Sequence, residues 1–232
     1  MNPLQTSEEA KEQLASRLAV YGIPTSFVEE LVSRHNAVAY EKGSRLFLRG
    51  APADLLFLVF SGLTKVYFPR LDGTRVLVHL AGPSDLIGNV NHIDPKGRRV
   101  QSFEVEALTR CTAALLTREH VIKSLQSLER GDLIRVIEGL NTAWSASAQR
   151  FAVFFGMTFR QRLEFILREL GARFGVRDSR GVVLMPELTQ TDLAEMIGCS
   201  RPMISRLVAD MKEDGLVLNE YRRFVLLDHL AV

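Results

Sequence analysis

Cysteine is scarce in this sequence, and its scarcity excludes several kinds of metal centre. The 232 residues contain two cysteines, Cys111 and Cys199, which lie far apart and have no CxxC neighbour. Zinc and iron–sulfur centres built on cysteine need clustered ligands at short spacings, so we expect neither. Isolated cysteines also favour a reducing compartment.

Long apolar runs, a leader segment and a charge excess are missing as well. No run approaches the roughly 18 apolar residues that span a bilayer, and residues 1–11 are polar and acidic, unlike a secretory signal. Lys and Arg number 29 against 27 Asp and Glu, and from residue 157 onward there are 11 basic and 11 acidic residues. We therefore expect a cytoplasmic protein without membrane contact. Any binding of nucleic acid must depend on where its charges lie.

Motifs of enzymes are absent too. The sequence has no Walker loop, no HExxH, no GxSxG and no cluster of carboxylates, and His35 and His120 are isolated. We therefore expect no enzymatic activity.

The first pattern that is present is a regular spacing of glycine. Six glycines recur from Gly43 to Gly88 at spacings of 6 to 12 residues and bracket short apolar runs such as LLFLVFSG. This spacing predicts a small antiparallel β-sandwich or barrel over about residues 37–116. LDGT at 71–74 fits a hairpin turn. Short helices are expected before this region, over 8–35, and after it from about residue 118.

A heptad seam follows the β-rich region. Seven residues recur at alternating steps of 4 and 3, one of them polar: Leu133, Ile137, Leu140, Trp144, Ser147, Phe151 and Phe154. So narrow a seam favours a partner helix, most simply the same helix of a second subunit, over packing within its own chain. Another amphipathic helix is expected after GM at 156–157, and GVRDSRG is expected to close it as a loop.

The last third of the chain has the pattern of a helix-turn-helix. Thr189 fits a helix N-cap with Asp192 in the capping-box position, and Gly198 supplies a left-handed turn. Ser200 is then expected to cap a second helix, which has Pro202 in its first turn.

The second of these helices presents arginine and small residues on the face opposite its apolar residues. Arginine matches guanine or phosphate, and small residues permit close approach, so we expect this face to enter a DNA major groove. A wing hairpin is expected in GLVLNEYRRFVLL. The expected DNA contacts are Thr189, Gln190, Ser200, Arg201, Pro202, Ser205, Arg206, Arg222 and Arg223. An ordinary solvated packing helix is the alternative.

Three segments resemble the CRP/FNR family of bacterial transcription regulators. TQTDLAEMIGCSRPMISRLVADMKEDGLV resembles its winged helix-turn-helix, while KGSRLFLRGAPADLLFLVFSGLTKVYF and DGTRVLVHLAGPSDLIGN look like its cyclic-nucleotide-binding β-roll. The seam matches its dimerisation helix. The resemblance implies an α+β fold. Its parts are an antiparallel β-roll (a double-stranded β-helix) as sensor over 1–125, a dimerisation helix over 126–156 and a winged helix-turn-helix over 157–232.

The resemblance also implies partners. It implies a homodimer that binds a pseudo-palindromic operator in double-stranded DNA and contacts RNA polymerase. By family position, Arg201, Ser205 and Arg206 contact the DNA. The family often has a glutamate where this chain has Pro202, so we expect its operator sequence to differ from those that such members bind.

The sensor region departs from the cyclic-AMP pattern of the family. Asn89 stands where cyclic-AMP-binding members have the glutamate that holds the ribose, and Gln101 and Ser102 stand where they have an Arg-Ser pair that neutralises the phosphate. Glutamine cannot neutralise a buried phosphate, although Arg98 or Arg99 could stand in. We therefore do not expect cyclic AMP. The candidate effector pocket consists of Ile87, Gly88, Asn89, Val90, Arg98, Arg99, Gln101 and Ser102.

Other signals remain open. Iron–sulfur sensing, as in the FNR branch, needs N-terminal cysteines that this chain lacks. Heme could bind through His79, His92 or Cys111, and Cys199 at a helix N-terminus, where the pKa of a thiol falls, could sense redox state. The sequence thus predicts a dimeric DNA-binding regulator that senses an unidentified small effector or a redox signal. A heme-based gas sensor, or a ligand-binding module that signals through protein contacts without DNA, is the alternative.

Overall fold

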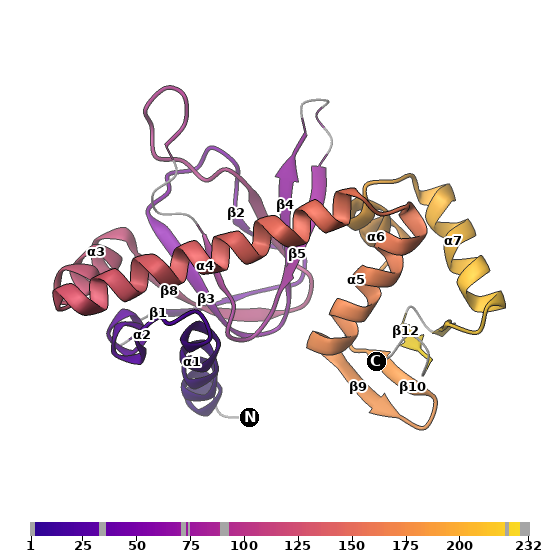
Figure 1. Cartoon of the computed structure of the whole chain (residues 1–232), viewed down its shortest axis with the longest axis horizontal. Coiled ribbons are helices and arrows are strands. Elements are labelled where there is room, and N and C mark those ends of the chain that lie inside the picture. Colours follow the sequence, from indigo (N-terminus) through magenta and orange to yellow (C-terminus); the bar gives the residue numbers. More distant parts are fainter. Residues whose placement is uncertain are drawn as a thin grey trace. The chain divides into compact units, whose positions relative to one another are not determined.

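The computed structural model describes residues 3–32, 36–70, 73, 75–88, 93–220 and 223–227. They group into two compact units, one of Met1–Thr74 with Val78–Gln149 and one of Arg75–Leu77 with Arg150–Val232. Figure 1 labels their helices and most of their strands. Within the described residues, no helix is both long enough and apolar enough to cross a bilayer.

The first unit begins with two helices that lie side by side (Figure 1). They are α1 (Pro3–Ala19) and α2 (Thr25–Val32). Helices were expected in this region and are confirmed, although α1 starts before residue 8. On α2, Phe27 and Leu31 recur at helical spacing and are buried in one apolar cluster with Leu58 of the following sheet. Burial of this face stabilises both helices against the roll.

The described strands of this unit form a β-roll of two antiparallel sheets. Their bounds are β1 (Asn36–Tyr40), β2 (Arg45–Phe47), β3 (Leu55–Ser61), β4 (Thr64–Pro69), β5 (Arg75–Ala81), β6 (Leu86–Gly88), β7 (Glu104–Ala107) and β8 (Cys111–Thr117). One sheet has the order β1-β8-β3-β6 and the other β2-β7-β4-β5. Strands distant in sequence pair with each other, so the predicted roll is confirmed. Of the hairpin expected at 71–74, the described residues include Gly73 alone.

The core of the roll consists of side chains that face inward at alternate strand positions. Phe47 and Phe57 meet edge to face with ring centroids 4.5 Å apart, and Val105 is fully buried in the same cluster. At the turn from β3 to β4, Gly62 has a φ of 78°. A Cβ at this glycine would lie 2.2 Å from the carbonyl oxygen of Arg110, so a larger residue does not fit.

Two helices follow the roll, α3 (Arg118–Gln126) and α4 (Arg130–Phe155). The hydroxyl of Thr117 caps α3 by accepting a hydrogen bond from the His120 amide at 3.2 Å. α4 begins in the first unit and ends at Phe155, and the two units divide within it, between Gln149 and Arg150. The sequence places the boundary at 156–157.

The described part of the second unit combines the end of α4, three further helices and a four-stranded antiparallel sheet. The elements are α5 (Phe159–Phe174), β9 (Gly175–Asp178), β10 (Gly181–Leu184), α6 (Gln190–Ile197), α7 (Arg201–Glu213), β11 (Val217–Glu220) and β12 (Arg223–Leu226), and the sheet order is β11-β12-β10-β9. Fully buried side chains hold them together: Leu163, Leu167, Leu184, Leu193, Ile197, Ile204, Met211 and Val217. This is the predicted winged helix-turn-helix.

The segment GVRDSRG at 175–181 is not a loop, in contrast to the expectation from the sequence. Most of it belongs to a hairpin in which Val176 pairs with Val183. The Asp178 carboxylate accepts a hydrogen bond from the Arg180 amide at 2.8 Å and shapes the turn. Pairing of β10 with β12 extends the hairpin into a sheet, which the isolated segment could not predict.

Candidate nucleic-acid interface

The first helix of the helix-turn-helix, α6, is held at its start by the predicted capping box. The Thr189 hydroxyl accepts a hydrogen bond from the Asp192 amide at 3.1 Å, and the Thr189 amide donates to the Asp192 carboxylate at 2.8 Å. The same hydroxyl donates to that carboxylate at 2.7 Å. The aspartate therefore performs the role that glutamate usually has. Asp192 is 4% exposed, which keeps this negative charge off the surface of α6.

Between α6 and α7 the chain turns at Gly198, as predicted. Gly198 has a φ of 76°, and the amides of Gly198 and Cys199 donate to the Ala194 carbonyl at 2.9 and 3.1 Å. A Cβ on Gly198 would meet nothing closer than a guanidinium nitrogen of Arg162 at 4.0 Å. The backbone angle, rather than a lack of space, therefore requires glycine here.

Ser200 is the N-cap residue of α7, but its side chain makes no capping hydrogen bond. The predicted N-cap position is therefore correct, but the Ser200 hydroxyl does not make the predicted capping hydrogen bond. A cap hydroxyl bonds to the amide of the second or third helical residue. Here the second is Pro202, which has no N–H, so one of the two usual donors is missing.

One face of α7 is buried and the opposite face is exposed, as the sequence predicts. The buried residues are Ile204, Leu207, Val208 and Met211. The exposed face carries Arg201, Pro202, Ser205, Arg206 and Ala209. At about 100° per residue, Pro202 lies opposite the middle of the buried set. Around the helix, Arg206 lies about 40° to one side of Pro202 and Arg201 about 100° to the other, so the face combines two arginines with small or apolar side chains.

Two of the predicted DNA contacts bond to each other. The Ser205 hydroxyl donates to the side-chain oxygen of Gln190 at 2.7 Å and lies 3.2 Å from the carbonyl oxygen of Arg201. The bond joins the first turn of α6 to α7. It orients the Gln190 amide and leaves the N–H groups of that amide as donors for a phosphate or a base.

α5 supports the C-terminal ends of both helices of the helix-turn-helix, a role that the sequence did not reveal. Arg162 donates to the carbonyl oxygen of Ile197, the last residue of α6, at 3.2 Å. Arg160 bonds Glu164 at 2.7 Å and Asp214, the residue that ends α7, at 2.7 Å. The hydrogen bond to Glu164, and to a lesser extent that to Asp214, raises the pKa of Arg160 above its ordinary value. No local pattern links Arg160 to a carboxylate so distant in the sequence.

The wing is a hairpin of β11 and β12, with Glu220 opposite Arg223. Arg223 is exposed, and Arg222 lies outside the described residues. The Glu220 carboxylate pairs with Arg180 at 2.6 Å, and Arg180 also pairs with Asp178 at 2.7 Å. Arg180 therefore offsets part of the negative charge at the wing, which reduces its repulsion of a phosphate backbone.

The expectation of a lowered pKa for Cys199 is wrong. Burial raises the pKa of this thiol, although a hydrogen bond from the Ile204 amide and the charge of Arg162 lower it in part. Cys111 is 1% exposed, and burial raises its pKa to about 11. Both thiols are thus less reactive than a free cysteine at neutral pH.

The candidate heme ligands are not brought together by the described part of the chain. Cys111 is buried on β8 and the half-exposed His79 lies on β5, in the other sheet. His92 lies outside the described residues. Among the described side chains, no group of three or more His, Cys, Asp or Glu could hold a metal ion.

Gly88 and Gln101 of the predicted effector pocket meet at the carbonyl group of Leu55. A Cβ on Gly88 would lie 2.8 Å from that carbonyl oxygen. Gln101 is fully buried, and its amide nitrogen lies 3.4 Å from the same oxygen. The side-chain oxygen of Gln101 is buried without a hydrogen-bond partner among the described residues. Ile87 is also buried.

The two arginines of the predicted effector pocket lie at the surface rather than with this pair. Arg98 and Arg99 are exposed, and Arg98 bonds Asp94 at 2.8 and 2.9 Å through two nitrogens. Arg98 is therefore held at the surface rather than beside Gln101. Ser102 is half-buried, and Asn89 and Val90 lie outside the described residues.

The seam of α4 is largely exposed. Ile137, Leu140, Trp144 and Phe151 have exposed fractions of 52%, 58%, 75% and 53%. The other face of the helix packs within the first unit: Val136 is buried, and a Cβ on Gly139 would come 2.5 Å from Ile23. The apolar stripe is thus separate from the face that α4 uses for its own fold.

The two residues at the ends of the seam are less exposed than these four. Leu133 is half-buried. Phe154 is also half-buried, with its ring 6.2 Å from the ring of Phe165 and 5.1 Å from the guanidinium of Arg162. The side chain of Ser147 lies outside the described part of the structure.

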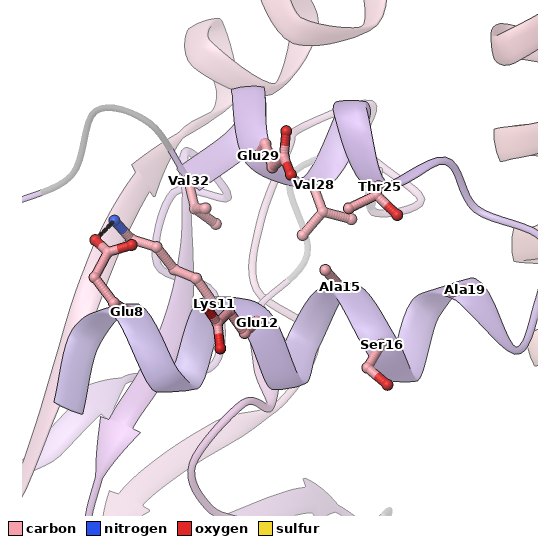
Figure 2. Close-up of a pocket in the computed structure, with 10 residues that line it drawn as sticks. All are labelled: Glu8, Lys11, Glu12, Ala15, Ser16, Ala19, Thr25, Val28, Glu29 and Val32. Atoms are coloured by element: carbon pink, nitrogen blue, oxygen red, sulfur yellow. Dashed lines mark hydrogen bonds and ion pairs between the residues drawn. The ribbon is translucent and has the colours of Figure 1, made fainter. Parts of the chain in front are cut away.

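A hollow of about 530 Å³ lies between α1 and α2 (Figure 2). Its floor includes Ala15 and Val28, and its rim carries Glu12 and a Lys11–Glu8 ion pair of 2.7 Å. All of its lining residues belong to α1 and α2. The sequence did not point to this hollow, and none of the predicted effector residues lines it.

Comparison with known families agrees with the two folds. Residues 37–128 match the family described as Cyclic nucleotide-binding domain. Residues 161–231 match the family described as Crp-like helix-turn-helix domain. The first range covers the β-roll and the second covers the winged helix-turn-helix.

Curated relatives extend over nearly the whole chain. The CRP-like cAMP-activated global transcriptional regulator of Mycobacterium tuberculosis is 26% identical over 222 residues, which is 94% of this chain and 96% of that protein. The transcriptional activator protein FnrL of Cereibacter sphaeroides is 23% identical over 197 residues, which is 83% of this chain and 77% of that protein. These relatives are transcription regulators, not enzymes.

Solved structures share the fold. The c-di-GMP-responsive global regulator of Xanthomonas campestris matches with a TM-score of 0.70 at 19% identity, over 87% of this chain and 98% of that chain. A CRP-family transcriptional regulator from Thermus thermophilus matches with a TM-score of 0.65 at 22% identity, over 84% of this chain and 96% of that chain.

Proposed function

Because the chain belongs to the CRP/FNR family of DNA-binding transcription regulators, we propose that it binds a two-fold symmetric operator as a homodimer. The exposed face of α7 is the observation that carries this proposal. Arg201 and Arg206 flank small side chains there, and the first acid along α7 is Asp210. Such a face suits a major groove, because it attracts phosphate and lets the helix approach the bases closely.

The exposed stripe of α4 supports the homodimer. Large apolar side chains that stay in contact with water mark an interaction surface when they form a contiguous patch. In a two-fold symmetric pair, the stripe of one subunit meets the same stripe of the other. Two reading helices related in this way contact half-sites whose centres are about 34 Å apart.

We also propose RNA polymerase as a partner and the cytoplasm as the compartment, because a regulator of transcription acts where RNA polymerase works. Family membership supports both.

The proposed effector of the β-roll is a small molecule other than cyclic AMP. The Mycobacterium tuberculosis relative is named as cAMP-activated, which makes cyclic AMP the first ligand to test. Gln101 argues against cyclic AMP, because a fully buried neutral amide cannot neutralise a phosphate. Arg98 does not replace the missing charge, since it is paired with Asp94 at the surface. A redox signal has weaker support, since burial raises the pKa of both cysteines.

Selection of genomic DNA fragments on the full-length protein tests DNA binding. It is run at physiological salt, first without ligand and then with candidate effectors. We expect enrichment of a two-fold symmetric sequence bound by two subunits. The matched control is the double variant Arg201→Ala, Arg206→Ala, which leaves the buried face of α7 intact and should abolish the enrichment. Failure of the unmodified protein to enrich any sequence under all these conditions would contradict the proposal.

A further inference from the structure

We propose that Pro202 recognises a thymine in each half of the operator through the 5-methyl group of the base. This inference rests on the proposed function, because it assigns a base preference to the DNA-reading face of α7. It names a residue that determines sequence specificity without a hydrogen bond.

Pro202 lies where a recognition helix comes closest to base edges. It is the second residue of α7 after the N-cap Ser200, and side chains from the N-terminal turn of such helices contact the bases. It is exposed and lies opposite the middle of the buried face that contains Ile204 and Val208. The ring therefore points away from the core of the second unit, toward the groove that α7 would enter.

The chemistry of proline restricts what this position can read. The side chain has no donor and no acceptor, and the backbone nitrogen carries no hydrogen. It cannot match the hydrogen-bonding edges of guanine, cytosine or adenine. The thymine methyl is the one apolar group that unmodified bases present in the major groove. A ring placed against a polar edge would remove water from that edge without replacing its hydrogen bonds.

The neighbouring side chains leave this position to apolar contact. The Ser205 hydroxyl donates to Gln190 at 2.7 Å and lies 3.2 Å from the Arg201 carbonyl, so its proton is already engaged. Ala209, two turns along the same face, adds only a methyl group. Arg201 and Arg206 lie on either side of the proline around the helix, and their guanidinium groups suit guanine or phosphate.

Removal of single methyl groups from the operator tests the inference. The selected operator is synthesised with deoxyuridine in place of one thymine at a time, changed symmetrically in both half-sites. Deoxyuridine keeps the pairing of thymine and lacks its methyl group. At one symmetric position we expect an affinity loss of about fourfold per half-site, or roughly 15-fold for the dimer, the factor that burial of one such carbon gives. In Pro202→Gly this loss should disappear at that position.

A second variant gives a gain of function that misfolding cannot imitate. Pro202→Glu places a carboxylate at the same point, and a carboxylate accepts a hydrogen bond from the cytosine amino group. Repeated selection on this variant should enrich cytosine where the unmodified protein enriches the methyl-sensitive thymine. The other positions of the operator should not change.

The inference is overturned if a symmetric operator is enriched but no thymine in it is sensitive to loss of its methyl group. It is equally overturned if Pro202→Glu keeps the original base at every position. In both cases the operator still depends on Arg201 and Arg206, so the proposed function survives. If no symmetric sequence is enriched at all, both are overturned.

Discussion

On the proposed DNA-reading face, some residues hold the two helices in place and others are available to contact DNA. Thr189 and Asp192 are engaged with each other in the capping box, and Ser205 is engaged with Gln190. Their hydrogen bonds hold the two helices in place. Arg206 lies on the exposed face of α7, one turn beyond Pro202, where a guanidinium can reach a base or a phosphate.

Arg206→Ala should weaken specific DNA binding. If the guanidinium contacts a base, affinity for the selected operator should fall by about 1–3 kcal/mol, with a smaller loss on unrelated DNA. Fluorescence anisotropy with labelled operator measures both. Arg130→Ala is the control, because it removes an exposed arginine outside the helix-turn-helix. Equal operator affinity of Arg206→Ala and the unmodified protein would remove this role.

Gly198→Ala should destabilise the second unit through the backbone alone. Its φ of 76° is left-handed, and no neighbour would contact the new Cβ closely. An L-residue in this conformation costs about 1–2 kcal/mol, which urea unfolding can measure. Gly131→Ala is the matched control, because Gly131 is helical and also has open space, so its replacement should stabilise by up to about 1 kcal/mol. Equal stability of the two variants would contradict the argument.

At the scale of elements, α4 and the winged sheet depend on different neighbours. α4 packs one face within the first unit, where Gly139 permits close approach to Ile23. Its apolar stripe remains exposed, which is unfavourable for a helix in water unless a partner covers it. The winged sheet needs all four strands, since each of its two hairpins alone is only marginally stable.

Trp144→Glu should separate the proposed dimer. Trp144 is 75% exposed at the middle of the stripe, and symmetry would bury two carboxylates near each other. Several kcal/mol of desolvation and repulsion would lower the dimer affinity by about 100-fold or more. Sedimentation velocity measures the mass. Ser145→Glu is the control, because it adds the same charge to α4 outside the seam. A dimer of unchanged stability in Trp144→Glu would show that the stripe is not the interface.

At the scale of the whole molecule, a β-roll and a winged helix-turn-helix share one chain, and α4 belongs to both units. A ligand that binds the roll can change DNA binding only if its affinity differs between the two conformations of the regulator. In the proposed regulator, the residues around Gln101 would therefore select the molecules that act on α7.

Cyclic AMP should have no effect on the unmodified protein. At millimolar concentrations we expect no heat of binding in calorimetry, no rise in Tm and no change in operator affinity, because the buried Gln101 cannot neutralise a phosphate. The paired variant Asn89→Glu, Gln101→Arg restores the family pattern and should bind cyclic AMP. Micromolar binding by the unmodified protein would show that the phosphate finds another cation.

Much of the fold and of the interface follows from short-range patterns in the sequence. The capping box at Thr189, the left-handed turn at Gly198 and the apolar face of α7 each depend on residues a few positions apart. Helical geometry alone relates such residues, so the sequence predicts them. The glycine-bracketed strands and the seam of α4 are periodic patterns of the same kind.

Only the tertiary structure decided the contacts between distant segments. No local pattern pairs Gln190 with Ser205, joins Arg160 to Asp214, or brings Gly88 and Gln101 to the Leu55 carbonyl. The same holds for Cys199, where the helix start predicts a lower thiol pKa and burial by surrounding segments raises it. The physical reason is common to all of them. Hydrogen bonds, desolvation and close packing depend on distances in space, which the chain fixes only when its helices and sheets pack together.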